Sequence, residues 1–182
     1  MKMQLLAQFD LHHRLYNNVL EDLTDEETNK RINGNTQMNH IKYLAGHLLN
    51  AQYGLAFLSG VPVEVKWDDL FAGPGKTKAK DNFPYPDIED IKKEWNDIHH
   101  EIRNGLSQLS PDMLDNLPPA PLNNVIENSP LKGLFNNSVA GLWAFFNHHQ
   151  AYHIGQIGIL RRGLGKPAMH YNETGIYSSE NK

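Results

Sequence analysis

Two histidines in the C-terminal third of the chain, His149 and His153, are four residues apart. In a helix this spacing places both imidazoles on one face, about 6 Å apart. Two imidazoles so placed can bind one divalent ion through metal–nitrogen bonds of about 2.0–2.1 Å. The spacing is not specific alone, because a chain with 10 histidines contains such pairs by chance. The alternative is two core histidines that are hydrogen-bonded to neighbouring groups.

A third histidine, His47, favours the metal. It lies in the middle of another apolar-periodic segment, beside Leu44 and Leu48. Residues in the middle of packed helices lie at one level whichever way the helices run, so His47 can join His149 and His153. Three neutral histidines leave a coordination position open, which is typical of catalytic metal sites. Zinc and nickel both suit imidazole, and either would activate a bound water or thiol.

Four segments with apolar residues at helical spacing must position these histidines. They cover residues 4–23, 36–58, 88–109 and 138–162. Strand signals are weak, so the sequence predicts an all-α four-helix bundle. The connections 59–86 and 110–137 are long and rich in Pro, Gly and Asn, and at least one should cross the length of the bundle.

Composition excludes several classes of protein. The 182 residues suit one domain, and the net charge of −4 argues against a nucleic-acid binder. The lack of cysteine excludes disulfides and thiolate metal sites, and it fits a reducing, cytoplasmic location. No apolar run is long enough for a membrane span, and no signal peptide is evident at the start.

The string NHHQAYHIGQIG at residues 147–158 resembles the signature helix of the DinB-like family of metal-binding four-helix bundles. Residues 160–167, 45–52 and 23–27 are also similar to that family. The resemblance implies a DinB-like domain over residues 1–171, followed by a polar tail at 172–182. It also implies a divalent ion held by His47, His149 and His153, and a homodimer. Family members of known chemistry include transferases and isomerases that use a low-molecular-weight thiol.

Two functions therefore stay open. The first is a metal-dependent enzyme, either a thiol-dependent transferase or a hydrolase, acting on a small-molecule substrate at an open three-histidine site. The alternative is a non-catalytic, stress-associated metal-binding bundle whose ion is structural. No catalytic side chain is identified by the sequence.

Three neighbours of the histidine pair are candidates for contacts to the ligands or the substrate. Gln156 follows on the same stripe and could orient a ligand ring or bind a metal-bound water. The alternative for Gln156 is a core amide bonded to another helix. Tyr152 and His148 flank the pair, with packing or solvent exposure as their alternatives.

Other residues have less specific interpretations. Arg161 and Arg162 could attract an anion, but they also suit the C-terminal end of a helix. His40 is expected in solvent, and His99 with His100 at the polar edge of its helix. A larger set is expected to be structural or peripheral: the glycines Gly155 and Gly158 at a close helix contact, the aromatic clusters at 67–71 and 83–86 as minor core, and His170 in the tail.

Overall fold

The computed structural model describes residues 1–71 and 78–169. Within these residues the regular structure is helical and no strand is formed, which confirms the all-α prediction. No helix in this part of the chain is long and apolar enough to cross a membrane. The expected boundary between domain and tail, at residues 171 and 172, lies outside the described residues, as does His170.

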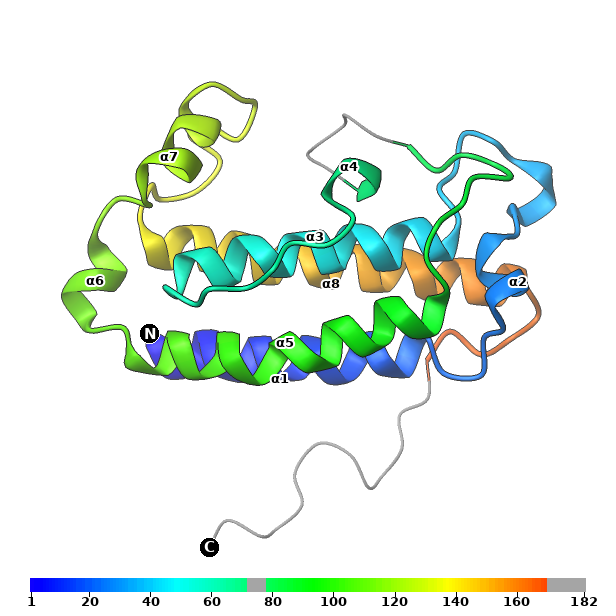
Figure 1. Cartoon of the computed structure of the whole chain (residues 1–182), viewed down its shortest axis with the longest axis horizontal. Coiled ribbons are helices and arrows are strands. Elements are labelled where there is room, and N and C mark those ends of the chain that lie inside the picture. Colours follow the sequence, from blue (N-terminus) through cyan, green and yellow to red (C-terminus); the bar gives the residue numbers. More distant parts are fainter. Residues whose placement is uncertain (72–77, 170–182) are drawn as a thin grey trace, which may run out of the picture.

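Four long helices correspond to the four predicted segments, and each packs against two of the others (Figure 1). Asn147 donates to the carbonyl of Leu5, and Arg161 donates to the carbonyl of Val19, so the first and last helices run in parallel. The two middle helices run the opposite way (Figure 1). The long helices are α1 (Lys2–Val19), α3 (Ile41–Leu58), α5 (Ile88–Gln108) and α8 (Val139–Gly163).

Because α3 and α5 are parallel, the connection between them must return along the bundle. It does so over its long side and carries the short helix α4 (Asp68–Phe71) (Figure 1). The second long connection stays at one end of the bundle and forms α6 (Pro111–Asp115) and α7 (Ala120–Glu127). Only the first long loop is therefore a crossover. The short helices α2 (Asp25–Asn29) and η1 (Ile32–Gly34) lie at the opposite end.

Polar caps determine where the helices begin. Thr24 and Glu27 form a reciprocal capping box at α2, and Asp87 and Ser138 cap α5 and α8. The predicted start of α3 near residue 36 is wrong. His40 caps this helix instead, because its Nδ1 accepts a hydrogen bond from the Tyr43 backbone N–H at 3.1 Å. His40 is 1% exposed, so the expectation that it lies in solvent is also wrong.

Aromatic rings fill the contact between α1 and its neighbours. Tyr16 stacks on Trp95 with ring centroids 3.8 Å apart, and Phe9 meets Trp143 edge-on at 5.4 Å. His99 joins this layer because its ring stacks on Phe9, with centroids 4.6 Å apart. The expected polar edge is therefore wrong for His99, whereas His100 is exposed. Burial lowers the pKa of His99 to about 4, so the ring is neutral in its stack.

Arg161 is a buried structural cation rather than an anion-binding group. Its side chain is 0% exposed, and its guanidinium donates to the carbonyls of Val19, Glu21 and Pro167. It therefore joins the end of α1 to the end of α8 and to the segment that follows. Arg162, its neighbour in sequence, is exposed.

Replacing Arg161 with Met should destabilise the protein by about 3 kcal/mol, because the substitution leaves several buried carbonyls without a donor. Chemical denaturation followed by circular dichroism measures this change. The matched control, Arg162→Met, should change the free energy of unfolding by less than about 0.5 kcal/mol. Equal effects of the two substitutions would contradict the structural role of Arg161.

Candidate metal centre

The three predicted histidines meet between α3 and α8. The Nε2 atom of His149 lies 3.1 Å from Nε2 of His47 and 3.1 Å from Nε2 of His153. All three side chains offer a ring nitrogen within 4.8 Å of the others, and all three are half-buried. Two nitrogens bound to one ion at 2.0–2.1 Å can be at most about 4.2 Å apart, so the 3.1 Å distances permit a shared ion.

Hydrogen bonds on the far side of two rings determine which nitrogen is free. Nδ1 of His47 lies 3.3 Å from the carbonyl oxygen of Phe71, and Nδ1 of His153 lies 2.7 Å from the amide oxygen of Gln156. Because both oxygens only accept, both Nδ1 atoms donate, which leaves lone pairs on the two Nε2 atoms. His149 Nε2 can supply at most one proton to them. A divalent cation at this point would satisfy every lone pair, so the donor set fits a metal ion.

The absence of a side chain at Gly46 in α3 lets Phe71 pack against this helix, which positions the Phe71 carbonyl beside His47. A Cβ atom on Gly46 would overlap the ring of Phe71, which lies directly against the helix at this point. The glycine costs about 1 kcal/mol of helix stability, and here it permits close packing of the crossover loop. Phe71 is buried, and its main chain faces the ring of His47. The sequence interpretation missed both Gly46 and Phe71, although a glycine directly before a ligand histidine was a visible signal.

Burial keeps the three rings neutral. Desolvation lowers the pKa of His149 to about 3, with a further contribution from the neighbouring His153 and His47. Burial likewise lowers the pKa of His153 to about 4, although the hydrogen bond to Gln156 opposes the shift. The pKa of His47 is lowered for the same reason. Neutral imidazole is the form that binds metal, so the site is prepared for an ion at neutral pH.

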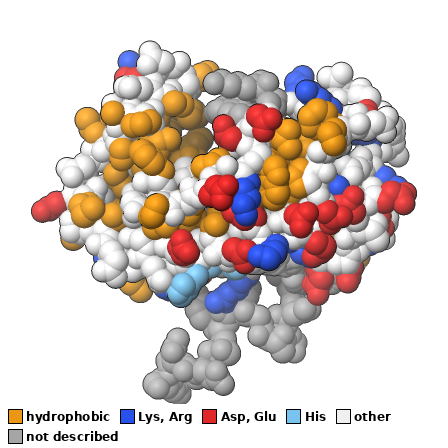
Figure 2. Space-filling view, viewed as in Figure 1, with side chains coloured by type: hydrophobic (Ala, Val, Ile, Leu, Met, Phe, Trp, Pro, Cys, Tyr) orange, Lys and Arg blue, Asp and Glu red, His pale blue; other side chains and the backbone are white. Residues whose placement is uncertain are grey.

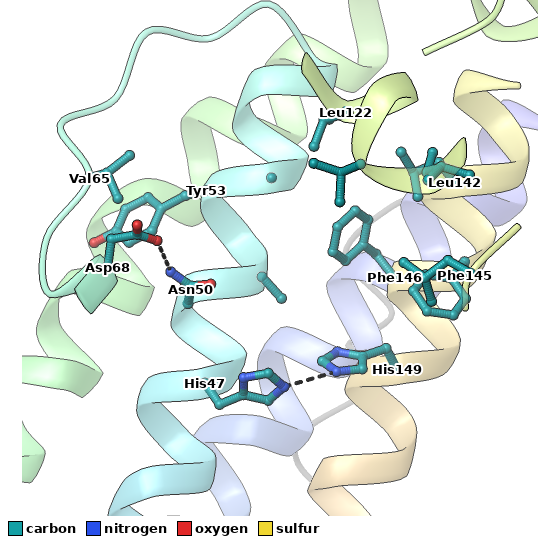
Figure 3. Close-up of a pocket in the computed structure, with 15 residues that line it drawn as sticks. His47, Asn50, Tyr53, Val65, Asp68, Leu122, Leu142, Phe145, Phe146 and His149 are labelled. Atoms are coloured by element: carbon teal, nitrogen blue, oxygen red, sulfur yellow. Dashed lines mark hydrogen bonds between the residues drawn. The ribbon is translucent and has the colours of Figure 1, made fainter. Parts of the chain in front are cut away.

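A pocket of about 590 Å³ opens above two of these histidines (Figure 3). His47 and His149 lie at one end of it, and Phe145 and Phe146 form the wall on α8. Both long connections contribute to the lining, Val65 and Asp68 from the first and Leu122, Val125, Ile126 and Leu131 from the second. The volume is typical of small-molecule sites.

The aromatic clusters in the first long connection were expected to be minor core. Phe71 belongs to the buried core as expected, but its main chain also supports the metal centre. The long connections therefore form part of the pocket wall, beside α3 and α8. The sequence left open that these clusters cap the mouth of the site, although minor core was the preferred interpretation.

Of the three neighbours named from the sequence, Gln156 contacts a ligand ring directly, through the hydrogen bond to His153. Tyr152 packs edge-on beside His153, with ring centroids 5.0 Å apart, but its side chain is 59% exposed and does not line the pocket. His148 is exposed and also lies outside the pocket lining. Within residues 1–71 and 78–169, no carboxylate or further histidine joins the three as a fourth ligand.

Residues 8–157 match the family model described as the DinB superfamily. The matched range contains the three clustered histidines and Gln156. A comparison with curated proteins found no match to the chain.

Metal affinity should be nearly independent of pH between 7.5 and 5.5. Three free imidazoles of pKa near 6.5 would lose about a thousandfold in affinity by pH 5.5 through protonation. Here burial lowers the pKa of all three rings, so protons compete less than they would at free imidazoles. We expect a change of less than about threefold, measured by equilibrium dialysis with metal analysis. A loss of a hundredfold would show that the rings titrate as exposed histidines do.

Replacing Gln156 with Leu should weaken metal binding about 10- to 100-fold, because His153 loses the acceptor that fixes its tautomer. Competition with a chelator measures this effect. His148→Ala is the control and should stay within about twofold of the wild type, since the residue is exposed and makes no contact with the pocket. The interpretation fails if the two variants behave alike.

Proposed function

The chain belongs to the DinB superfamily, and we propose that it is an enzyme that uses one divalent metal ion, zinc or nickel, held by His47, His149 and His153. One observation carries the proposal: three neutral imidazoles direct free nitrogens to one point at the end of a pocket. Half-buried nitrogen lone pairs that face one another do not stabilise the bundle, because they have lost water without gaining hydrogen-bond donors. Its position beside a space for a small molecule is what a reaction requires.

In this proposal the residues of the chain hold the ion, orient the ligand rings and shield the substrate from water. The Phe71 carbonyl and Gln156 fix two of the ligand rings, and Phe145 stacks on the ring of His149 with centroids 6.2 Å apart. The apolar walls exclude water from the substrate. An ion bound here supplies Lewis-acid chemistry, which makes a coordinated water or thiol more acidic. No side chain is assigned as a general base.

The reaction we propose is transfer of a low-molecular-weight thiol to a small substrate, or hydrolysis of such a substrate. Both use an acidified ligand at an open coordination position, and three protein ligands leave such a position. A thiol-conjugation screen with and without metal separates the two. The cytoplasmic location predicted from the cysteine-free composition stays a prediction.

A structural ion in a non-catalytic protein is the second candidate. It would need a closed coordination shell, with a fourth protein ligand in place of water or substrate. The described residues offer three ligands beside a pocket, which favours the enzyme.

We also propose that the protein is a homodimer that uses the outer face of α8. Tyr152, Gly155 and Ile159 form an exposed stripe at helical spacing, and Ile159 is 65% exposed. A Cβ on Gly155 would have no described atom of the chain within 4 Å, so this glycine leaves room for a second copy. Gly158 differs, because it packs against Ala168 of its own chain. Sedimentation should show a dimer at tens of micromolar and a monomer for Ile159→Lys; a monomeric wild type would contradict the proposal.

Replacing His149 with Ala should abolish stoichiometric metal binding while leaving the helical circular dichroism signal largely intact. The ring is the one shared by both short Nε2 contacts, whereas apolar packing holds the bundle together. Metal analysis of the isolated protein measures the result. His100→Ala, an exposed histidine on α5, should keep a full equivalent. Retention of a full equivalent of tightly bound zinc or nickel by His149→Ala would refute the assignment.

A further inference from the structure

The pocket above the metal centre carries charge of one sign. Of its described lining residues, Asp68 alone has a formal charge, and none is a lysine or arginine. The remaining polar groups are His47 and His149, Asn50 and Tyr53. With no lysine or arginine among these residues, Asp68 repels a carboxylate placed beside it and attracts an ammonium group.

Asp68 is held in position at the edge of this space. Its Oδ1 accepts a hydrogen bond of 2.8 Å from Nδ2 of Asn50, which projects from α3 into the same pocket (Figure 3). Among the described residues, no other hydrogen bond or ion pair involves this carboxylate, so its second oxygen is available to a ligand. The bond to Asn50 reduces the freedom that Asp68 would lose on binding a cation.

The lysine nearest in sequence does not neutralise Asp68. Lys66 pairs with the buried carboxylate of Glu94, which also accepts a hydrogen bond of 3.2 Å from the hydroxyl of Tyr53. Asp69 adds another carboxylate beside Asp68. The α4 side of the pocket is therefore acidic, and acidic side chains border the hydrophobic hollow in the space-filling view (Figure 2).

The rest of the pocket is apolar and long enough for a hydrocarbon body. On α3, the small residues Ala51 and Gly54 line the pocket without filling it. A Cβ on Gly54 would lie 3.0 Å from the ring of Phe146, so a larger residue there would crowd that ring. Val125, 53% exposed, continues the apolar lining to the surface. Asn50 lies about one helical turn beyond His47, so the metal end and the Asp68 end of a ligand are separated by a few carbon atoms.

We propose that this pocket binds small amphiphilic amines: molecules with an apolar or aromatic body and a cationic ammonium group that Asp68 selects. The inference rests on the proposed function, because it assumes that this pocket is the substrate site. It narrows that function to amine-bearing substrates or aminothiols, and it disfavours thiols that carry free carboxylates. The reacting group of such a ligand lies at the His47 and His149 end, and the amine lies at Asn50 and Asp68.

Three probes of similar size test the proposal: 4-phenylbutylamine, 4-phenylbutan-1-ol and 4-phenylbutyric acid. Their binding to the full chain is measured by calorimetry, with bound metal and after removal of metal by a chelator. In the metal-free protein we expect the amine to bind about three- to fivefold tighter than the alcohol, and the acid to bind weakest, as for a solvent-exposed charge pair. With metal bound, the carboxylate of the acid can also coordinate the ion, so the metal-free comparison decides. Failure of all three probes to bind, or equal affinity for amine and acid without metal, would overturn the proposal.

Matched variants assign the selectivity to Asp68. Asp68→Asn keeps an oxygen for Asn50 but removes the charge, so the amine and the alcohol should then bind within about twofold of each other. The neighbouring charge variant Asp69→Asn should keep the wild-type ratio, because Asp69 does not line the pocket. Val125→Arg adds a cation at the exposed rim and should invert the order of amine and acid. Unchanged selectivity in Asp68→Asn would refute the inference.

The chelated sample separates this proposal from the proposed function. If the chain binds no metal, the proposed function fails, yet the preference for the amine is still measured in the metal-free pocket. If stoichiometric metal is present and the preference is absent, the proposed function stands and the inference about amines fails.

Discussion

Three imidazoles gathered at one point, with Nε2 of His149 3.1 Å from Nε2 of both His47 and His153, are the constraint on which the candidate site and its surroundings depend. Such a cluster costs least when the rings stay neutral and their other nitrogens find partners. Burial between α3 and α8 meets the first condition. The Phe71 carbonyl and Gln156 meet the second for two of the rings. The relative position of these two helices must therefore be fixed closely.

The long helices and the connections between them contribute different parts of the site. The long helices carry the ligand side chains, whose positions tolerate little change. The two long connections supply much of the pocket wall, with Val65 and Asp68 from one and Leu122 and Val125 from the other. A rigid centre with variable walls is a general route to different substrates on one scaffold. In this chain the walls are apolar, and the one charged lining residue among those described is an acid.

Periodicity and spacing were enough to predict the helices and the histidine cluster. Apolar stripes determine which faces are buried, and the spacing of His149 and His153 determines that they share one, so both follow from local sequence. The start of α3 did not follow, because capping by His40 depends on a histidine accepting a backbone hydrogen bond, which is uncommon among caps. The burial of Arg161 and the role of Phe71 were also missed. Both depend on backbone carbonyls contributed by distant segments, and a main-chain group leaves no trace in residue types.

The contact between Gly46 and Phe71 has an evolutionary consequence. The crossover loop supports His47 through a carbonyl, which every amino acid possesses, so the support itself places no demand on the side chains around it. The sequence requirement is instead that residue 46 stays a glycine, so that the ring of Phe71 can pack against α3. Drift in the rest of α4 can then remodel the mouth of the pocket, Asp68 included, while the coordination geometry is inherited unchanged. Relatives that differ in what they accept can thus diverge through single substitutions in this loop, with no intermediate that loses the histidine cluster.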